Sequence, residues 1–116
     1  MDKEELKKRT KKFALDIIKL IEDFPKTKTG DVIGRQLLRS ATSVGANYRA
    51  ACRARSQADF ISKLGVVEEE ADESLFWLEL TLESELISED KTAALISEAD
   101  ELTAIFTASR KTAKGL

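Results

Sequence analysis

The stretch Gly34–Arg55, GRQLLRSATSVGANYRAACRAR, decides the fold of this chain. At helical spacing it carries two adjacent rows of apolar or small residues. The first row is Ile33, Leu37, Ser40, Val44, Asn47 and Ala51, and the second is Gly34, Leu38, Ala41, Gly45, Tyr48 and Cys52. Four arginines share the opposite side within roughly 80° of arc: Arg35, Arg39, Arg49 and Arg53. A helix with this pattern has more than one surface to cover, which indicates a core built from several helices.

Apolar residues at helical spacing also fill the sequence on both sides of this stretch. They predict four helices at about residues 3–24, 31–55, 57–86 and 89–112. Pro25 ends the first helix, Asp31 is the expected N-cap of the second, and Ser56 and Ser88 are the expected N-caps of the third and fourth. Helices of this length with short connections predict one all-α domain over residues 1–116, an up-down-up-down antiparallel four-helix bundle.

Composition narrows the class of protein. The chain has 116 residues, one Pro, one Cys and no His. The lone Cys52 cannot form an internal disulfide, and the charged, amphipathic start MDKEELKKRTKK does not have the apolar run of a signal peptide. No apolar run approaches the ~20 residues that a membrane span needs. We therefore expect a cytoplasmic protein with no membrane partner.

The net charge of −2 conceals two oppositely charged halves. Residues 1–55 hold 14 Lys and Arg against 7 Asp and Glu, a net of +7, whereas residues 56–116 hold 5 against 14, a net of −9. This division is compatible with neutralisation between neighbouring helices, with charge matching between copies, or with a basic surface for nucleic acid.

The sequence offers little to a catalytic or metal centre. Without His, neither a carboxylate-histidine di-iron site nor a Ser-His or Cys-His pair can be assembled. Gly34 and Gly45 lie inside a helical pattern and match no phosphate-binding loop. Arginines close to a cysteine are typical of a reactive thiol, but a small half-buried cysteine is the simpler interpretation of Cys52. We expect no enzyme activity, no catalytic residue, no metal, no cofactor and no small-molecule substrate.

Asn47 falls in the first apolar row rather than among the arginines. A hydrogen-bonded amide at such a position fixes the register of neighbouring helices. We predict that Asn47 is a structural polar residue of the core and not a ligand-binding residue.

Like charges repeat at i,i+4 on the second and third predicted helices, and each such pair is unfavourable by roughly 0.2–0.5 kcal/mol in an isolated helix. The third helix carries an acidic side made of Glu69, Asp72, Phe76, Glu79 and Glu83. Because this side points away from its own core, we expect it to meet the four arginines of another copy. Such a head-to-tail contact closes into a ring when the rotation allows. The alternative is unpaired charge that faces solvent.

Several segments carry a pattern found in a known family. They are the run Gln-Leu-x-Arg-Ser-Ala-x-Ser-Val-x-x-Asn over Gln36–Asn47, then Arg55-Ser56, Phe60-Ile61, and EEADESLFWLEL over Glu69–Leu80. Together with Phe24-Pro25 they resemble the bacterial 23S rRNA intervening-sequence proteins, and the resemblance covers nearly the whole chain. The chain departs from many members at Gly45, where they have Pro, and at Ala51-Cys52, where they have Glu-Gly.

The resemblance implies a non-enzymatic four-helix bundle that assembles as a ring, with the homopentamer as the form known in the family. A related bundle, the accessory protein of diversity-generating retroelements, engages a reverse transcriptase and nucleic acid through a basic surface. By this analogy we expect RNA or an RNA-handling protein as a partner.

The candidate phosphate contacts are the first-helix lysines Lys8, Lys11, Lys12 and Lys19. Arg35, Arg39, Arg49 and Arg53 are candidates for either RNA binding or subunit pairing. The alternative is a protein-protein adaptor or structural ring with no nucleic-acid partner, in which the subunit interface occupies the arginines.

Overall fold

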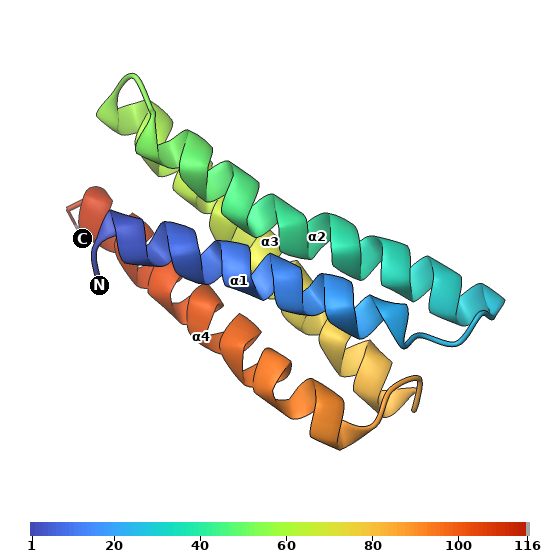
Figure 1. Cartoon of the computed structure of the whole chain (residues 1–116). Coiled ribbons are helices and arrows are strands. Elements are labelled where there is room, and N and C mark those ends of the chain that lie inside the picture. Colours follow the sequence, from blue (N-terminus) through green and yellow to red (C-terminus); the bar gives the residue numbers. More distant parts are fainter. Residues whose placement is uncertain (116) are drawn as a thin grey trace.

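The computed structural model describes residues 1–115 and contains four α-helices in this part of the chain. They are α1 (Lys3–Glu22), α2 (Lys28–Cys52), α3 (Gln57–Glu83) and α4 (Glu89–Ala113). Consecutive helices run antiparallel and pack side by side around one core, in a bundle of 44 × 20 × 20 Å with both termini at one end (Figure 1). The predicted all-α four-helix bundle is confirmed.

The helix starts depend on capping side chains. α2 begins three residues before the predicted position because its N-cap is Thr27 and not Asp31: the Gly30 N–H donates to the Thr27 Oγ1 at 3.1 Å. Ser56 is the N-cap of α3, as predicted, and its Oγ accepts a hydrogen bond from the backbone at 3.0 Å. Ser88 precedes α4, but its side chain makes no capping hydrogen bond.

The end of α3 lies three residues before the predicted one. Glu85 adopts a left-handed conformation with φ of 61°, and this stops the helix. The Leu86 N–H then donates to the Thr81 carbonyl oxygen at 3.1 Å. This is the Schellman arrangement, in which glycine is the usual residue at the left-handed position. The first and second helices also end earlier than predicted, at residues 22 and 52.

The core residues repeat at steps of three and four along each helix. On α3 they are Leu64, Val67, Ala71, Ser74, Leu78 and Thr81. Ser74 and Thr81 fill core positions where the apolar spacing of the sequence favours Leu75 and Leu82, and the two leucines are only half-buried. Each buried hydroxyl donates at 2.8 Å to a carbonyl one turn earlier in α3, so burial leaves it satisfied. The Ser74 Oγ also lies 3.0 Å from the Ser40 Oγ of α2.

Asn47 lies outside the fully buried core, contrary to the prediction. It is half-buried, and its Nδ2 donates at 2.8 Å to the Ser43 carbonyl of its own helix. Tyr48 is 4% exposed and fills the core position instead, with its ring centroid 5.3 Å from that of Phe106 on α4. The buried hydrogen bond between α2 and α3 is therefore made by the two serine hydroxyls and not by this amide.

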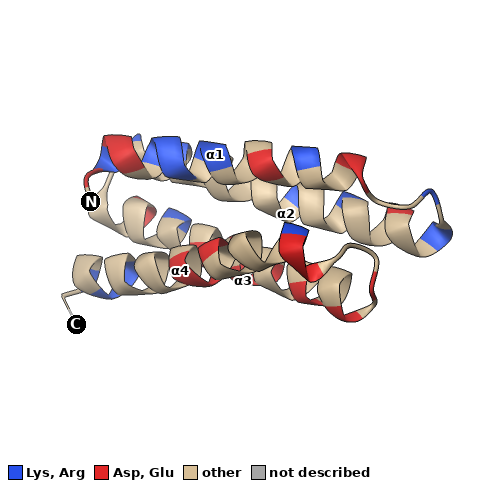
Figure 2. Ribbon diagram, turned by 60° about the horizontal axis from the view of Figure 1, so that its bottom comes forward, with Lys and Arg blue, Asp and Glu red and all other residues tan. Residues whose placement is uncertain are grey.

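Charge divides across the bundle as well as along the sequence. Lys and Arg concentrate on α1 and its connection to α2, whereas Asp and Glu are most abundant on α3 and α4 (Figure 2). Because α1 and α2 are neighbours in the bundle, basic side chains of the two helices can line one surface.

Candidate nucleic-acid interface

A groove between α1 and α2 collects positive charge from both helices. Five of its lining residues are cationic: Lys7, Lys8, Lys11, Arg49 and Arg53. The others are small: Ala14, Thr42, Gly45 and Ala46. The groove has a volume of about 470 Å³, and no Asp or Glu of the described residues lines it. We call this surface the basic groove.

Helical spacing arranges these cations in two facing rows. Lys7 and Lys11 are four residues apart, as are Arg49 and Arg53, so each pair is about 6 Å apart along its own helix axis. At Gly45 the helices approach closely, because a Cβ added there would lie 3.5 Å from a backbone oxygen of α1. Lys7 was not among the candidates predicted from the sequence, although it is four residues from Lys11 and so lies on the same side of α1.

Most of these cations have no carboxylate partner within their own chain. Lys7 pairs with Glu4 at 3.1 Å. Among residues 1–115, no carboxylate lies at ion-pair distance from Lys8, Lys11, Arg49 or Arg53. Four unpaired like charges around one groove repel one another, and a bound anion removes that repulsion.

The structure separates the other predicted basic candidates from the groove. Lys12 lines a hollow between α1 and α4 and pairs with Asp16 at 2.6 Å. Lys19 is exposed on α1 outside the groove. Arg35 pairs with Asp31, one turn earlier in α2, at 2.8 Å. The predicted set of eight cations is therefore not one surface, and only four of the eight meet.

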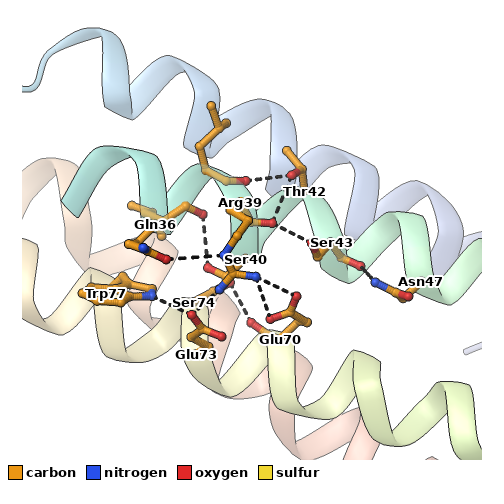
Figure 3. Close-up of polar contacts among 12 residues, drawn as sticks. Gln36, Arg39, Ser40, Thr42, Ser43, Asn47, Glu70, Glu73, Ser74 and Trp77 are labelled. Carbon is orange, nitrogen blue, oxygen red and sulfur yellow. Dashed lines mark hydrogen bonds and ion pairs between the residues drawn. The ribbon is translucent and has the colours of Figure 1, made fainter. Parts of the chain in front are cut away.

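Arg39 points toward α3 and not into the basic groove. Its guanidinium pairs with Glu70 at 3.1 Å and also with Glu73 (Figure 3). The Trp77 Nε1 donates to Glu73 at 3.1 Å, and this hydrogen bond together with the Arg39 guanidinium holds the pKa of Glu73 below its usual range. Arg39 therefore pairs with carboxylates of its own chain, whereas the sequence predicted carboxylates of another copy.

The predicted acidic side of α3 is exposed on the outside of the bundle. Its members share one side of the helix: Glu69, Asp72, Phe76, Glu79 and Glu83. We call this surface the acidic ridge. Phe76 is 51% exposed, and its ring packs edge-on against Trp77 with 5.0 Å between the centroids. The ridge thus presents one large apolar side chain among four carboxylates.

The described residues offer no cluster for a metal ion. Within residues 1–115, no group of three or more Cys, Asp or Glu side chains could hold one. Cys52 is half-buried, and burial together with the Cys52 thiol raises the pKa of the Tyr48 hydroxyl. None of the four helices in this part of the chain is both long and apolar enough to cross a membrane.

These features define an all-helical bundle with a basic groove between two helices and an acidic ridge on a third. The chain belongs to the family described as 23S rRNA-intervening sequence protein, whose model matches residues 2–108. The family expected from the sequence is confirmed.

A solved structure resembles this chain in both sequence and fold. It is the crystal structure of a protein with unknown function from the S23 ribosomal protein family of Bacteroides thetaiotaomicron VPI-5482. The two are 34% identical with a TM-score of 0.84, and the match covers 90% of this chain and 97% of that one. No curated protein sequence matches the chain.

Proposed function

We propose that this protein is a non-enzymatic, homo-oligomeric four-helix bundle of the cytoplasm that binds RNA or an RNA-protein complex through the basic groove. The groove itself is the main support, because five cations from two helices line it without an acidic residue. Lysine and arginine contacts to phosphates release counterions and supply much of the affinity for nucleic acid. The family description, 23S rRNA-intervening sequence protein, is consistent with a role near RNA.

The double variant Arg49→Glu/Arg53→Glu tests this function. We expect it to bind a labelled structured RNA at least about tenfold more weakly than the wild type in fluorescence anisotropy, because two phosphate contacts become repulsive. Wild-type affinity should fall steeply between about 50 and 200 mM salt, and the double variant should show a shallower dependence.

A matched control is Lys26→Glu/Lys28→Glu, which changes the net charge equally at the far end of α2, about 30 Å from Arg49 along the helix. Its RNA affinity should stay within about threefold of the wild type. Thermal melting by circular dichroism establishes that both variants are folded. An RNA affinity that does not change with salt, or that is the same in the groove variant as in the wild type, rules out the basic groove as the site.

A structural ring or protein-protein adaptor without nucleic acid is the second candidate, and the acidic ridge favours it. Phe76 is half exposed among four carboxylates, and the basic groove offers small residues flanked by unpaired cations. In a head-to-tail assembly, the ridge of one copy would lie in the groove of the next, and such contacts close into rings. The family resemblance implies a ring of five.

Charge exchange tests this second candidate. Glu79→Lys/Glu83→Lys should convert the oligomer to smaller species in light scattering, because like charges then face each other across the contact. Combining these substitutions with Arg49→Glu/Arg53→Glu should restore the wild-type mass. An unchanged mass in both double variants contradicts the ridge-groove contact. If Arg49→Glu/Arg53→Glu keeps the wild-type mass but no longer binds RNA, the groove is the RNA site and not the contact between copies.

A further inference from the structure

We infer that the basic groove holds the phosphate backbone of a double helix and reads no bases. This inference rests on the proposed RNA-binding function and names the form of nucleic acid that the groove accepts. It follows from which side chains line the groove, which do not, and how the two helices place the cations.

The basic groove offers no surface on which a base can stack. Single-stranded nucleic acids are held in large part by stacking of bases on aromatic rings. No Phe, Tyr or Trp is among the groove's lining residues. The one aromatic residue of α2, Tyr48, is 4% exposed and packs against Phe106. Phe76 is part of the acidic ridge on α3 and Trp77 lies beside it, and the carboxylates of this ridge repel phosphate.

The groove also lacks side chains that read base edges. Its only neutral hydrogen-bonding side chain is Thr42, whose hydroxyl donates to the Leu38 carbonyl of its own helix at 2.7 Å. The α2 amides are engaged elsewhere: Gln36 accepts from Arg39 at 3.4 Å, and Asn47 donates within α2 (Figure 3). Arginine can read guanine in a wide major groove, but the major groove of A-form RNA is too deep and narrow for side chains.

The helix backbones that carry the cations are fixed relative to each other, and this favours an ordered ligand. They stand on two antiparallel helices that pack side by side, so the distance between the two rows is set at the level of the backbone. A double helix presents its phosphates in regular rows before it binds. A single strand must give up conformational freedom to lie along the groove, and no stacking offsets this loss. The groove therefore favours the duplex.

Four labelled nucleic acids test the inference by fluorescence anisotropy on the full-length protein at low salt. They are two RNA hairpins of about 20 base pairs with unrelated sequences, an unstructured RNA single strand with as many phosphates, and a DNA duplex that matches one hairpin. The hairpins should bind within about threefold of each other, because phosphate contacts carry no sequence information. The single strand should bind at least about tenfold more weakly, because it has to be ordered.

The outcomes separate this inference from the proposed function. A single strand that binds as tightly as the hairpins, or hairpins that differ by more than about tenfold, would overturn the inference and leave RNA binding intact. A DNA duplex that binds more tightly than the matching hairpin contradicts RNA as the ligand but supports recognition of a helical backbone. Absence of binding to all four ligands overturns the proposed function. Hairpin affinity unchanged by Arg49→Glu/Arg53→Glu overturns the placement in the groove.

Discussion

Phe106→Ala is expected to lower the free energy of unfolding by about 3–5 kcal/mol, which is a large part of the stability of a small domain. The Phe106 side chain is 0% exposed and packs against Tyr48, so its removal leaves a cavity in the core between α4 and α2. Helical backbones on both sides limit how far the site can collapse. Urea unfolding followed by circular dichroism measures the change, and an unchanged m-value shows that the unfolded reference is the same.

Phe76→Ala is the matched control for this substitution. It removes the same ring from a position that is 51% exposed, so the free energy of unfolding should change by less than about 0.5 kcal/mol. Equal losses in the two variants would contradict the assignment of Phe106 to the core and Phe76 to the surface.

Gly30→Ala is expected to lower the free energy of unfolding by about 3 kcal/mol, at the upper end of the cost of overpacking. A Cβ at Gly30 would lie well inside van der Waals contact with the Pro25 carbonyl oxygen, and this obstacle is backbone rather than a flexible side chain. The Gly30 N–H also donates to the N-cap Thr27, so a displaced backbone weakens the cap as well. Thermal and urea unfolding measure the loss.

Gly65→Ala, in the interior of α3, is the control for replacing a helical glycine where no backbone obstructs the new Cβ. An added Cβ there would meet only the Arg110 Cδ, at 3.7 Å, which is an ordinary contact. Alanine is favoured over glycine inside a helix, so the free energy of unfolding of this variant should rise by about 0.5–1 kcal/mol. A rise in the free energy of unfolding in both Gly30→Ala and Gly65→Ala would show that the Pro25 carbonyl does not restrict the side chain at position 30.

Helical periodicity was sufficient to predict the bundle because apolar residues recur every three or four positions in all four helices. On α3 it failed where the core contains hydroxyl groups. Ser74 and Thr81 count as polar in a hydrophobic pattern, yet each donates to a carbonyl of its own helix and can be buried without loss. The apolar pattern on α3 therefore favoured Leu75 and Leu82. On α2, the predicted row continued from Val44 to Asn47, whereas the buried row continues to Tyr48.

The basic groove could be predicted only in part, because it depends on which helix lies on each flank of α2. Arg39 and Arg49 are ten residues apart, which places them about 80° apart around α2. The sequence groups them on one side of a helix. In the bundle, α3 packs along one flank of α2 and α1 packs along the other. Arg39 therefore lies next to carboxylates of α3, whereas Arg49 lies next to lysines of α1. The spacing of residues within α2 carries no information about which neighbour lies on which flank.

The segregation of charge makes the bundle an electric dipole, although its net charge is only −2. At physiological salt, fields are screened over about 8 Å, so a distant polyanion experiences little force from the molecule. At shorter range, the opposite signs of the basic groove and the acidic ridge exert a torque that turns the groove toward the polyanion and the ridge away from it. The orientation of an encounter is then set before the surfaces touch, and added salt should slow association more than it speeds dissociation.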